Sequence, residues 1–122
     1  MLDFKKIEVW KRSHQLTIGI YKATQHFPKE EIFGLTSQIR RAVSSIPTNI
    51  AEGCGRRSNA ELANFMNIAS GSASEVEYEI LLSKEIGYIS VEQYEAWTRE
   101  ISEIRSMLAA YMSKLTTKKS EN

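Results

Sequence analysis

The side chains that could carry out catalysis are few and scattered. The chain holds two histidines, His14 and His26, and one cysteine, Cys54. Metal centres in helical proteins need several ligands at fixed spacing, and neither a His-Glu-x-x-His nor a Glu-x-x-His pair occurs. Cys54 could be a reactive thiol beside Arg56 and Arg57. It has no histidine to act as its base, however, so we interpret it as a free cysteine at a helix end. These residues predict a protein that is not an enzyme and uses no metal or cofactor.

Lysines and arginines offer a second kind of chemistry, which is phosphate binding. Residues 1–57 hold ten Lys/Arg and five acids, a balance of +5, whereas residues 58–122 hold six and ten, a balance of −4. A nucleic-acid-binding surface needs several cations on one face, because each neutralised phosphate releases counterions. The predicted nucleic-acid-binding residues are Lys5, Lys6, Lys11, Arg12, Lys22, Arg40, Arg41, Arg56 and Arg57. The alternative is that the basic and acidic halves attract each other, within one chain or between chains.

Glutamates form a third candidate group, in the acidic half. Four of them crowd one predicted helix: Glu75, Glu77, Glu79 and Glu85. Paired carboxylates can perform acid–base chemistry or hold a metal, but on one helix they more often face solvent or meet basic residues of a neighbour. We therefore expect Glu75 or Glu79 to face an arginine of the preceding helix. The candidates are Arg40 and Arg41.

The apolar spacing that must position these residues is helical throughout. The first helix is predicted from about Phe4 to Phe27, with a stripe at Val9, Ser13, Leu16, Ile20, Ala23 and Phe27. The second carries Leu35, Ile39, Val43, Ile46 and Ile50. The third and fourth begin at capping boxes that start with Ser58 and Ser90. The predicted fold class is all-α, an antiparallel up-down-up-down four-helix bundle over residues 1–116 with a frayed polar tail over 117–122.

Glycine and proline positions predict local features of these helices. Pro47 lies inside the second stripe and removes a backbone donor, so we expect a kink without a break. The hydroxyl groups that could bond the freed carbonyls belong to Ser44, Ser45 and Thr48. Gly53 and Gly55 are predicted to end this helix in a left-handed conformation. Gly71 lies in an unusually small segment of the third helix, so we expect a close helix crossing there, which Gly71→Leu would overpack.

Asn49 and Glu52 form a pair on the last turn of the second helix. A carboxylate at a helix C-terminus is unfavourable, so Glu52 is expected to have a partner, with Arg56 or Arg57 the nearest. Two interpretations are open. The pair either locks the connection to the third helix or contacts another subunit.

Composition and length bound the class of protein. The 122 residues suit one domain, and 42% hydrophobic with 25% charged residues is an ordinary balance for a globular protein. No apolar run approaches the ~20 residues that span a bilayer, and the first residues lack the apolar segment of a secretory signal. A single cysteine cannot form an intrachain disulfide, so a reducing, cytoplasmic location without a membrane partner is expected.

Several apolar residues lie outside the four stripes and predict association with other copies of the chain. They are Trp10, Ile18, Tyr21, Tyr78, Leu81, Leu82 and Tyr88. A monomer rarely exposes a contiguous apolar patch larger than several hundred Å². Opposite charges in the two halves also suit a head-to-tail contact between copies, which can close into a ring.

The chain resembles the four-helix-bundle proteins encoded within intervening sequences of bacterial 23S ribosomal RNA genes. The matching segments are 4–11, 27–42, the motif Ser45-Ile46-Pro47-x-Asn49-Ile50-Ala51-Glu52-Gly53, and 68–75. The resemblance implies a homopentameric ring and a relationship to accessory proteins of diversity-generating retroelements, which bind nucleic acid and a reverse transcriptase. The family supplies no catalytic residues. The family motif and structural positions marked in this chain are Arg41, Pro47, Asn49, Glu52, Gly53, Gly71 and Glu75.

Two functions are consistent with these observations. The first is a non-enzymatic oligomeric scaffold that binds RNA or a nucleoprotein through its basic half. The second is a protein-interaction module with no nucleic-acid role. A continuous positive rim on the assembled oligomer favours the first, whereas a basic half neutralised by the acidic half favours the second.

Overall fold

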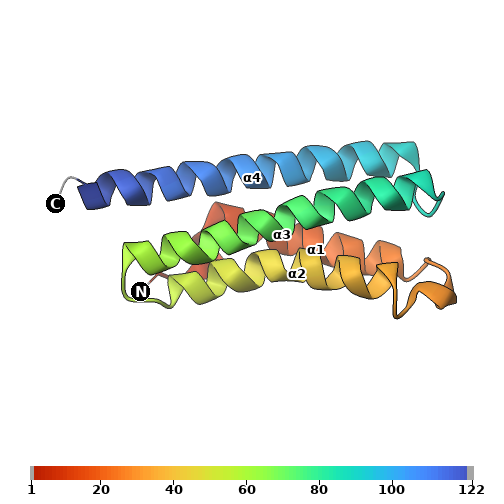
Figure 1. Cartoon of the computed structure of the whole chain (residues 1–122), viewed down its shortest axis with the longest axis horizontal. Coiled ribbons are helices and arrows are strands. Elements are labelled where there is room, and N and C mark those ends of the chain that lie inside the picture. Colours follow the sequence, from red (N-terminus) through yellow and green to blue (C-terminus); the bar gives the residue numbers. More distant parts are fainter. Residues whose placement is uncertain (1, 121–122) are drawn as a thin grey trace.

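Four long helices and two short 3-10 turns make up the computed structural model, which describes residues 2–120 and their side chains as far as residue 116. The order is η1 (Phe4–Lys6), α1 (Glu8–Thr24), η2 (Lys29–Glu31), α2 (Leu35–Cys54), α3 (Asn59–Glu85) and α4 (Val91–Ser120). Residues 2–120 contain no strand, so the predicted all-α fold class is confirmed. Figure 1 shows the chain reversing direction at each connection between helices. The tail predicted at 117–122 lies outside the residues whose side chains are described.

Serine hydroxyls cap the starts of α3 and α4, and a glycine follows the end of α3. The Ser58 hydroxyl accepts a hydrogen bond from the backbone N–H of Glu61 at 3.1 Å. The Ser90 hydroxyl accepts one from the N–H of Gln93 at 3.0 Å. Gly87 has a positive φ of 84° just beyond α3, where glycine avoids the clash of a Cβ atom. Both predicted helix starts are therefore confirmed.

The predicted start of the first helix at Phe4 is wrong. The Asp3 carboxylate caps a separate turn by accepting from the N–H of Lys5 at 3.1 Å, and Ile7 is extended with φ −89° and ψ 125°. The N–H of Leu2 also donates to the carbonyl of Cys54 at 3.1 Å. The chain is thus tied to the end of α2 before α1 begins at Glu8. The helix also ends at Thr24, before the predicted Phe27.

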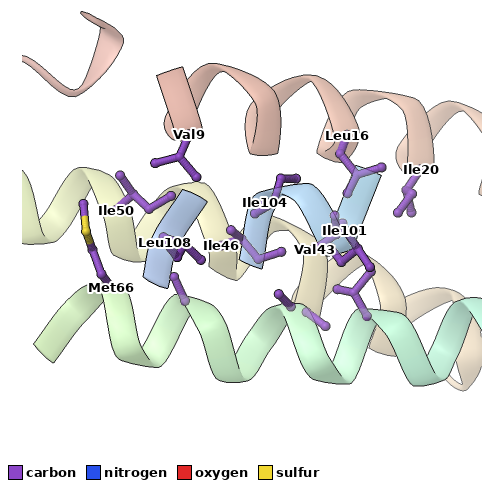
Figure 2. Close-up of a cluster of buried hydrophobic side chains, with 14 of the residues drawn as sticks. Val9, Leu16, Ile20, Val43, Ile46, Ile50, Met66, Ile101, Ile104 and Leu108 are labelled. Atoms are coloured by element: carbon purple, nitrogen blue, oxygen red, sulfur yellow. The ribbon is translucent and has the colours of Figure 1, made fainter. Parts of the chain in front are cut away.

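One apolar core runs the length of the bundle, with contributions from every helix (Figure 2). The predicted stripe of α2 is buried in full, and α4 contributes Ile101, Ile104 and Leu108 with no exposed surface. On α1, Thr24 is buried where the stripe prediction named Ala23. Each large aliphatic side chain buried in this way contributes about 1.5–3 kcal/mol. The core fixes the rotation of each helix and hence the direction of its polar residues.

Pro47 lies inside α2, and the helix continues through it without a break, as predicted. Proline leaves the carbonyl of the residue four positions earlier without its usual donor. That carbonyl belongs to Val43, and it accepts a hydrogen bond from the Thr17 hydroxyl of α1 at 3.1 Å. The prediction that Ser44, Ser45 or Thr48 would supply the donor is wrong, because a neighbouring helix supplies it.

The glycine predictions need two corrections. Gly53 and Gly55 are not left-handed; Gly87 is the one glycine of residues 2–120 with a positive φ. A Cβ atom on Gly53 would lie 2.8 Å from the Cβ of Phe65, so Gly53 is where α2 and α3 approach most closely among the glycine positions. A Cβ atom on Gly71 would meet nothing within 4 Å, so the predicted crossing is not there. Glycine in a helix interior still costs about 1 kcal/mol relative to alanine.

Candidate functional site

The nine cations predicted to bind nucleic acid do not form one cluster. Lys5 and Lys6 lie on η1, which the Leu2–Cys54 hydrogen bond holds near the α2–α3 connection with its Arg56 and Arg57. This end group of cations is defined by Lys5, Lys6, Arg56 and Arg57. Lys22, Arg40 and Arg41 lie toward the other end, since fourteen residues, roughly 21 Å of α2, separate Arg40 from the helix end at Cys54.

The Arg12 side chain forms an ion pair within the chain, with Glu100 of α4. Its Nε donates to Glu100 Oε2 at 3.1 Å and its Nη2 to Glu100 Oε1 at 2.5 Å, a two-pronged contact that joins α1 to α4. Glu103 lies 3.9 Å away. The hydrogen bond that Arg12 donates to Glu100 is the main reason that the pKa of Arg12 is raised. Arg12 therefore pairs the basic half with the acidic half inside one chain.

Arg40 faces α1, contrary to the expected pairing with Glu75 or Glu79. Its Nε donates to the Thr24 hydroxyl at 2.8 Å, its Nη2 donates to the carbonyl of Tyr21 at 3.2 Å, and its guanidinium lies 5.0 Å from the Tyr21 ring centre. A cation is favourable at this C-terminal end of α1 because of the helix dipole. Arg41 is exposed, and neither arginine forms an ion pair with those glutamates in the described residues.

Glu79 is buried without a partner for one of its oxygens. Its side chain lies on α3 two turns after Ser72, whose hydroxyl is 2.9 Å from that of Ser45, so Glu79 faces the α2 side. The residue is 4% exposed, and Oε1 has no hydrogen-bond partner in the part of the chain that the structure describes. Burial, with a smaller contribution from Glu75, raises the pKa of Glu79 to about 7. The carboxyl can therefore exchange a proton near neutral pH.

Glu77 shows the pairing that Glu79 lacks. Its carboxylate accepts from Arg105 Nη1 of α4 at 2.6 Å, and the same guanidinium reaches the Ser74 hydroxyl at 3.3 Å. The four crowded glutamates therefore do not act together, because one pairs with α4 and one is buried toward α2. Together with Arg12 and Glu100, this pair places two cation–carboxylate contacts on α4.

Asn49 and Glu52 do not belong to one hydrogen-bond network. The Asn49 amide donates to the carbonyl of Ser45 at 2.8 Å and to its hydroxyl at 2.9 Å. Glu52 pairs with Arg56 at 3.1 Å, and the Arg56 guanidinium lies 4.8 Å from the ring centre of Phe65. The expected partner of Glu52 is confirmed. This pair helps to hold the connection between α2 and α3, while Asn49 supports the polar contact between these helices.

A pocket of about 280 Å³ opens at the end of the bundle that carries the end group of cations. Arg56 and Arg57 line it together with Ser58 and Asn59 at the start of α3, and with Tyr111 from α4. Cys54 also lines this pocket and is buried. Burial, with a smaller effect of Asp3, raises the pKa of its thiol, which is the opposite of what a reactive thiolate needs.

Exposed apolar side chains were only partly identified from the sequence. Tyr21 and Tyr78 are exposed as expected, whereas Tyr88 packs on Phe27 and donates to Glu31. The sequence interpretation missed six residues that expose between 45% and 95% of their surface: Leu2, Ile32, Phe33, Ile68, Ile86 and Val91. Ile68 lies ten residues before Tyr78 on the same face of α3, and this helical spacing is the sequence signal that could have identified it.

Within the described residues, no three side chains of His, Cys, Asp or Glu are grouped so that they could hold a metal ion. None of the described helices has the length and apolarity needed to cross a membrane.

Comparison with known proteins identifies similar chains. A family model described as 23S rRNA-intervening sequence protein matches residues 5–110. A crystal structure of a protein with unknown function, from the S23 ribosomal protein family of Bacteroides thetaiotaomicron VPI-5482, superposes with a TM-score of 0.79. Its sequence is 30% identical, and the match covers 86% of this chain and 95% of that one. None of the curated proteins matches the sequence.

Proposed function

Because the chain belongs to the 23S rRNA-intervening sequence protein family, we propose that it is a non-enzymatic, homo-oligomeric scaffold that binds RNA or a nucleoprotein. The observation that carries this proposal is the end group of cations. Lys5, Lys6 and Arg57 are exposed and form no ion pair within the described residues, and they lie beside the arginine-lined pocket. Exposed cations without carboxylate partners are what phosphate contacts require.

The oligomer would multiply this surface. Each copy adds the same four cations, so several copies that point the same way gather them at one rim. The family resemblance implies five copies, and we propose that number here. Light scattering tests this part, with an expected mass of about five times 13.9 kDa. A mass near 13.9 kDa would exclude the oligomer.

An RNA titration at two salt concentrations tests the nucleic-acid part. The variant Lys6→Glu with Arg57→Glu removes two exposed cations of the end group. The matched control is Lys29→Glu with Arg99→Glu, which changes the net charge equally at exposed positions elsewhere. For single-stranded RNA, the end-group variant should bind more weakly and lower the slope of log K against log salt by about 1.4. The control should bind like the natural protein.

The second candidate, a protein-interaction module without a nucleic-acid role, is favoured by the pairing of opposite charges inside the chain. Arg12 with Glu100 and Arg105 with Glu77 each use cations and carboxylates that would otherwise be free. RNA binding that is equal for the end-group variant and its control, or that is undetectable at low salt, would support this candidate. A single free cysteine also suits a reducing cytoplasm for either function.

A further inference from the structure

A second stripe on α3 has no partner within the chain. Ile68, Gly71, Glu75 and Tyr78 follow a 3-4-3 spacing, and we call them the α3 outer face. All four are exposed, Ile68 by 45% and Tyr78 by 62%. A Cβ atom on Gly71 would meet nothing within 4 Å, so nothing in this chain uses the space that the glycine leaves. A helix that packs from outside would use it.

A groove of matching character lies between α1 and α2, which run side by side (Figure 1). It consists of two hollows of about 380 and 480 Å³ that share Thr17. Small side chains of α2 line its floor, namely Ser44, Pro47 and Ala51. Its wall carries rings and branched side chains of α1: Trp10, His14, Ile18 and Tyr21. We call this surface the α1–α2 groove.

We propose that the α3 outer face of one copy packs into the α1–α2 groove of the next copy. This inference rests on the homo-oligomer of the proposed function and names the two surfaces that form it. The lengths agree: Ile68 to Tyr78 spans about 15 Å of helix, and Arg40 to Ala51 spans about 16 Å. One surface projects large side chains around a glycine, and the other has a floor of small ones.

The spacing of the two surfaces also agrees when the incoming α3 runs antiparallel to α2. The α2 positions fall at intervals of four, three and four residues, against three, four and three on α3, so they stay within one residue of register. The resulting opposed pairs are Ile68 with Ala51, Gly71 with Pro47, Glu75 with Ser44, and Tyr78 with Arg40. The glycine thus meets the proline, where neither backbone is shielded by a long side chain.

Charge complements shape in this register. Glu75 is exposed and forms no ion pair in residues 2–116. Opposite Ser44, it lies within about one helical turn of both Arg40 and Arg41 of the next copy. The edge of the groove also carries Lys22. A carboxylate among three cations is attracted, whereas the reversed direction of α3 would place Glu75 nearer to Trp10 and lose this contact.

The same register is compatible with rotational symmetry. Within one chain α3 already runs antiparallel to α2, as the Ser45–Ser72 and Gly53–Phe65 contacts show. A copy related by rotation about an axis along the bundle therefore presents its α3 in the required direction. Such a contact joins two different surfaces and can close into a ring. All copies then point the same way, which brings the end groups of cations to one rim.

Cysteine pairing tests which surfaces meet. In the register above, Gly71 of one copy lies opposite Pro47 and Thr48 of the next, and both Gly71 and Thr48 are exposed in the single chain. Mild oxidation of the double variant Thr48→Cys with Gly71→Cys should give a ladder of covalent multimers on a non-reducing gel. Each single variant should stay a monomer on the same gel, because its new thiols do not meet and Cys54 is buried.

Dimers from Gly71→Cys alone would mean a two-fold contact and would overturn the proposal. The absence of a ladder from the double variant would overturn it as well.

Charge exchange gives an independent test in solution. Arg41→Glu and Glu75→Arg should each weaken association at least tenfold, measured by light scattering over a dilution series. The double variant that carries both changes should regain most of the natural affinity, because the pair is reversed rather than lost. Arg99→Glu, on an exposed position of α4, is the matched control and should have no effect. Unchanged association in both single variants overturns the proposed contact.

The homo-oligomer and the surfaces that form it are tested by different results. If the natural protein is a monomer by light scattering, the homo-oligomer of the proposed function is wrong and this contact falls with it. If the natural protein is an oligomer but the ladder and the charge exchange fail, only the assignment of surfaces is wrong. RNA binding by the natural protein stands apart from both results.

Discussion

The contact between α2 and α3 differs between its two ends. At one end the helices approach so closely that a Cβ atom on Gly53 would lie 2.8 Å from Phe65 and 2.9 Å from Leu62. At the other end the interface contains the Glu79 carboxyl, buried with one oxygen unpartnered in the described residues. Tight packing marks a contact completed within one chain. A buried carboxyl oxygen without a hydrogen-bond partner lowers the stability of the folded chain, because its lost hydration is not replaced.

The largest expected effect concerns Glu79 and pH. Its pKa is about 7 in the folded chain and near 4.5 when exposed, so the folded state holds its proton more tightly. Stability contributed by this group is fully present below pH 4.5 and falls as pH rises toward 7, by about 3 kcal/mol in total.

Glu79→Gln, which stays neutral, should abolish this dependence. In urea unfolding, the variant and the natural protein should be similar at pH 5, and the variant should be more stable by about 3 kcal/mol at pH 8. Glu85→Gln is the control, because Glu85 is exposed at the end of α3, whereas burial and Glu75 are what raise the pKa of Glu79. Equal pH profiles for Glu79→Gln and the natural protein would show that the two ends of the contact do not differ in this respect.

At the tight end, the expected effect is somewhat smaller. Gly53→Val would force its side chain against Phe65 and Leu62, so the helices must separate. Overpacking of this kind costs about 1–3 kcal/mol. Thermal unfolding should show the loss at every pH between 5 and 8. Gly55→Val, whose Cβ would meet only the carbonyl of Glu52 at 3.5 Å, is the matched control and should lose much less.

Periodicity was a good guide to burial and a poor guide to partners. The core stripe of α2 followed from spacing alone, because a helix exposes or buries each residue according to its angle around the axis. The partner of Arg40 could not be predicted from spacing, since a small rotation of one helix decides whether that side chain meets α1 or α3. Contacts such as Arg12 with Glu100, eighty-eight residues apart, depend on packing that no local pattern records.

Glycine illustrates the same limit at the candidate surfaces. Gly53, Gly55 and Gly71 look alike in the sequence, and their roles depend on what lies opposite in space. Gly53 has a neighbouring helix there, Gly71 has open space, and the one positive φ in residues 2–120 belongs to Gly87. The cations behave likewise, because the basic half of the sequence divides in space between two ends of the bundle and the half-buried pair of Arg12 with Glu100.

Between the two ends, Pro47 interrupts the hydrogen bonds of α2, and a hydroxyl of α1 supplies the missing donor. Thr17→Val keeps the shape of the side chain but removes the donor to the carbonyl of Val43. A buried carbonyl that loses its partner costs about 1–3 kcal/mol, and we expect the lower end because the helix can shift toward the groove. Ser102→Ala, at an exposed hydroxyl of α4 outside the α1–α2 groove, is the control and should change the urea midpoint little.

The smallest expected effect is a gain in the folding stability of the single chain, from Gly71→Ala. Gly71→Ala adds a methyl group that meets nothing within 4 Å in this chain, and it removes the flexibility of a helix-interior glycine. The single chain should therefore become more stable by about 0.4–1 kcal/mol, in contrast with Gly53→Ala, which should lose stability. Measurement must separate folding from association, so unfolding is followed in the Arg41→Glu variant, diluted until light scattering shows only the monomer; this is the monomeric background. In the natural background the same methyl group would lie against Pro47 of the next copy, and weaker association of Gly71→Ala would accompany its higher intrinsic stability. A loss of stability in the monomeric background would show that Gly71 is packed like Gly53, and the contrast between the two glycines would disappear.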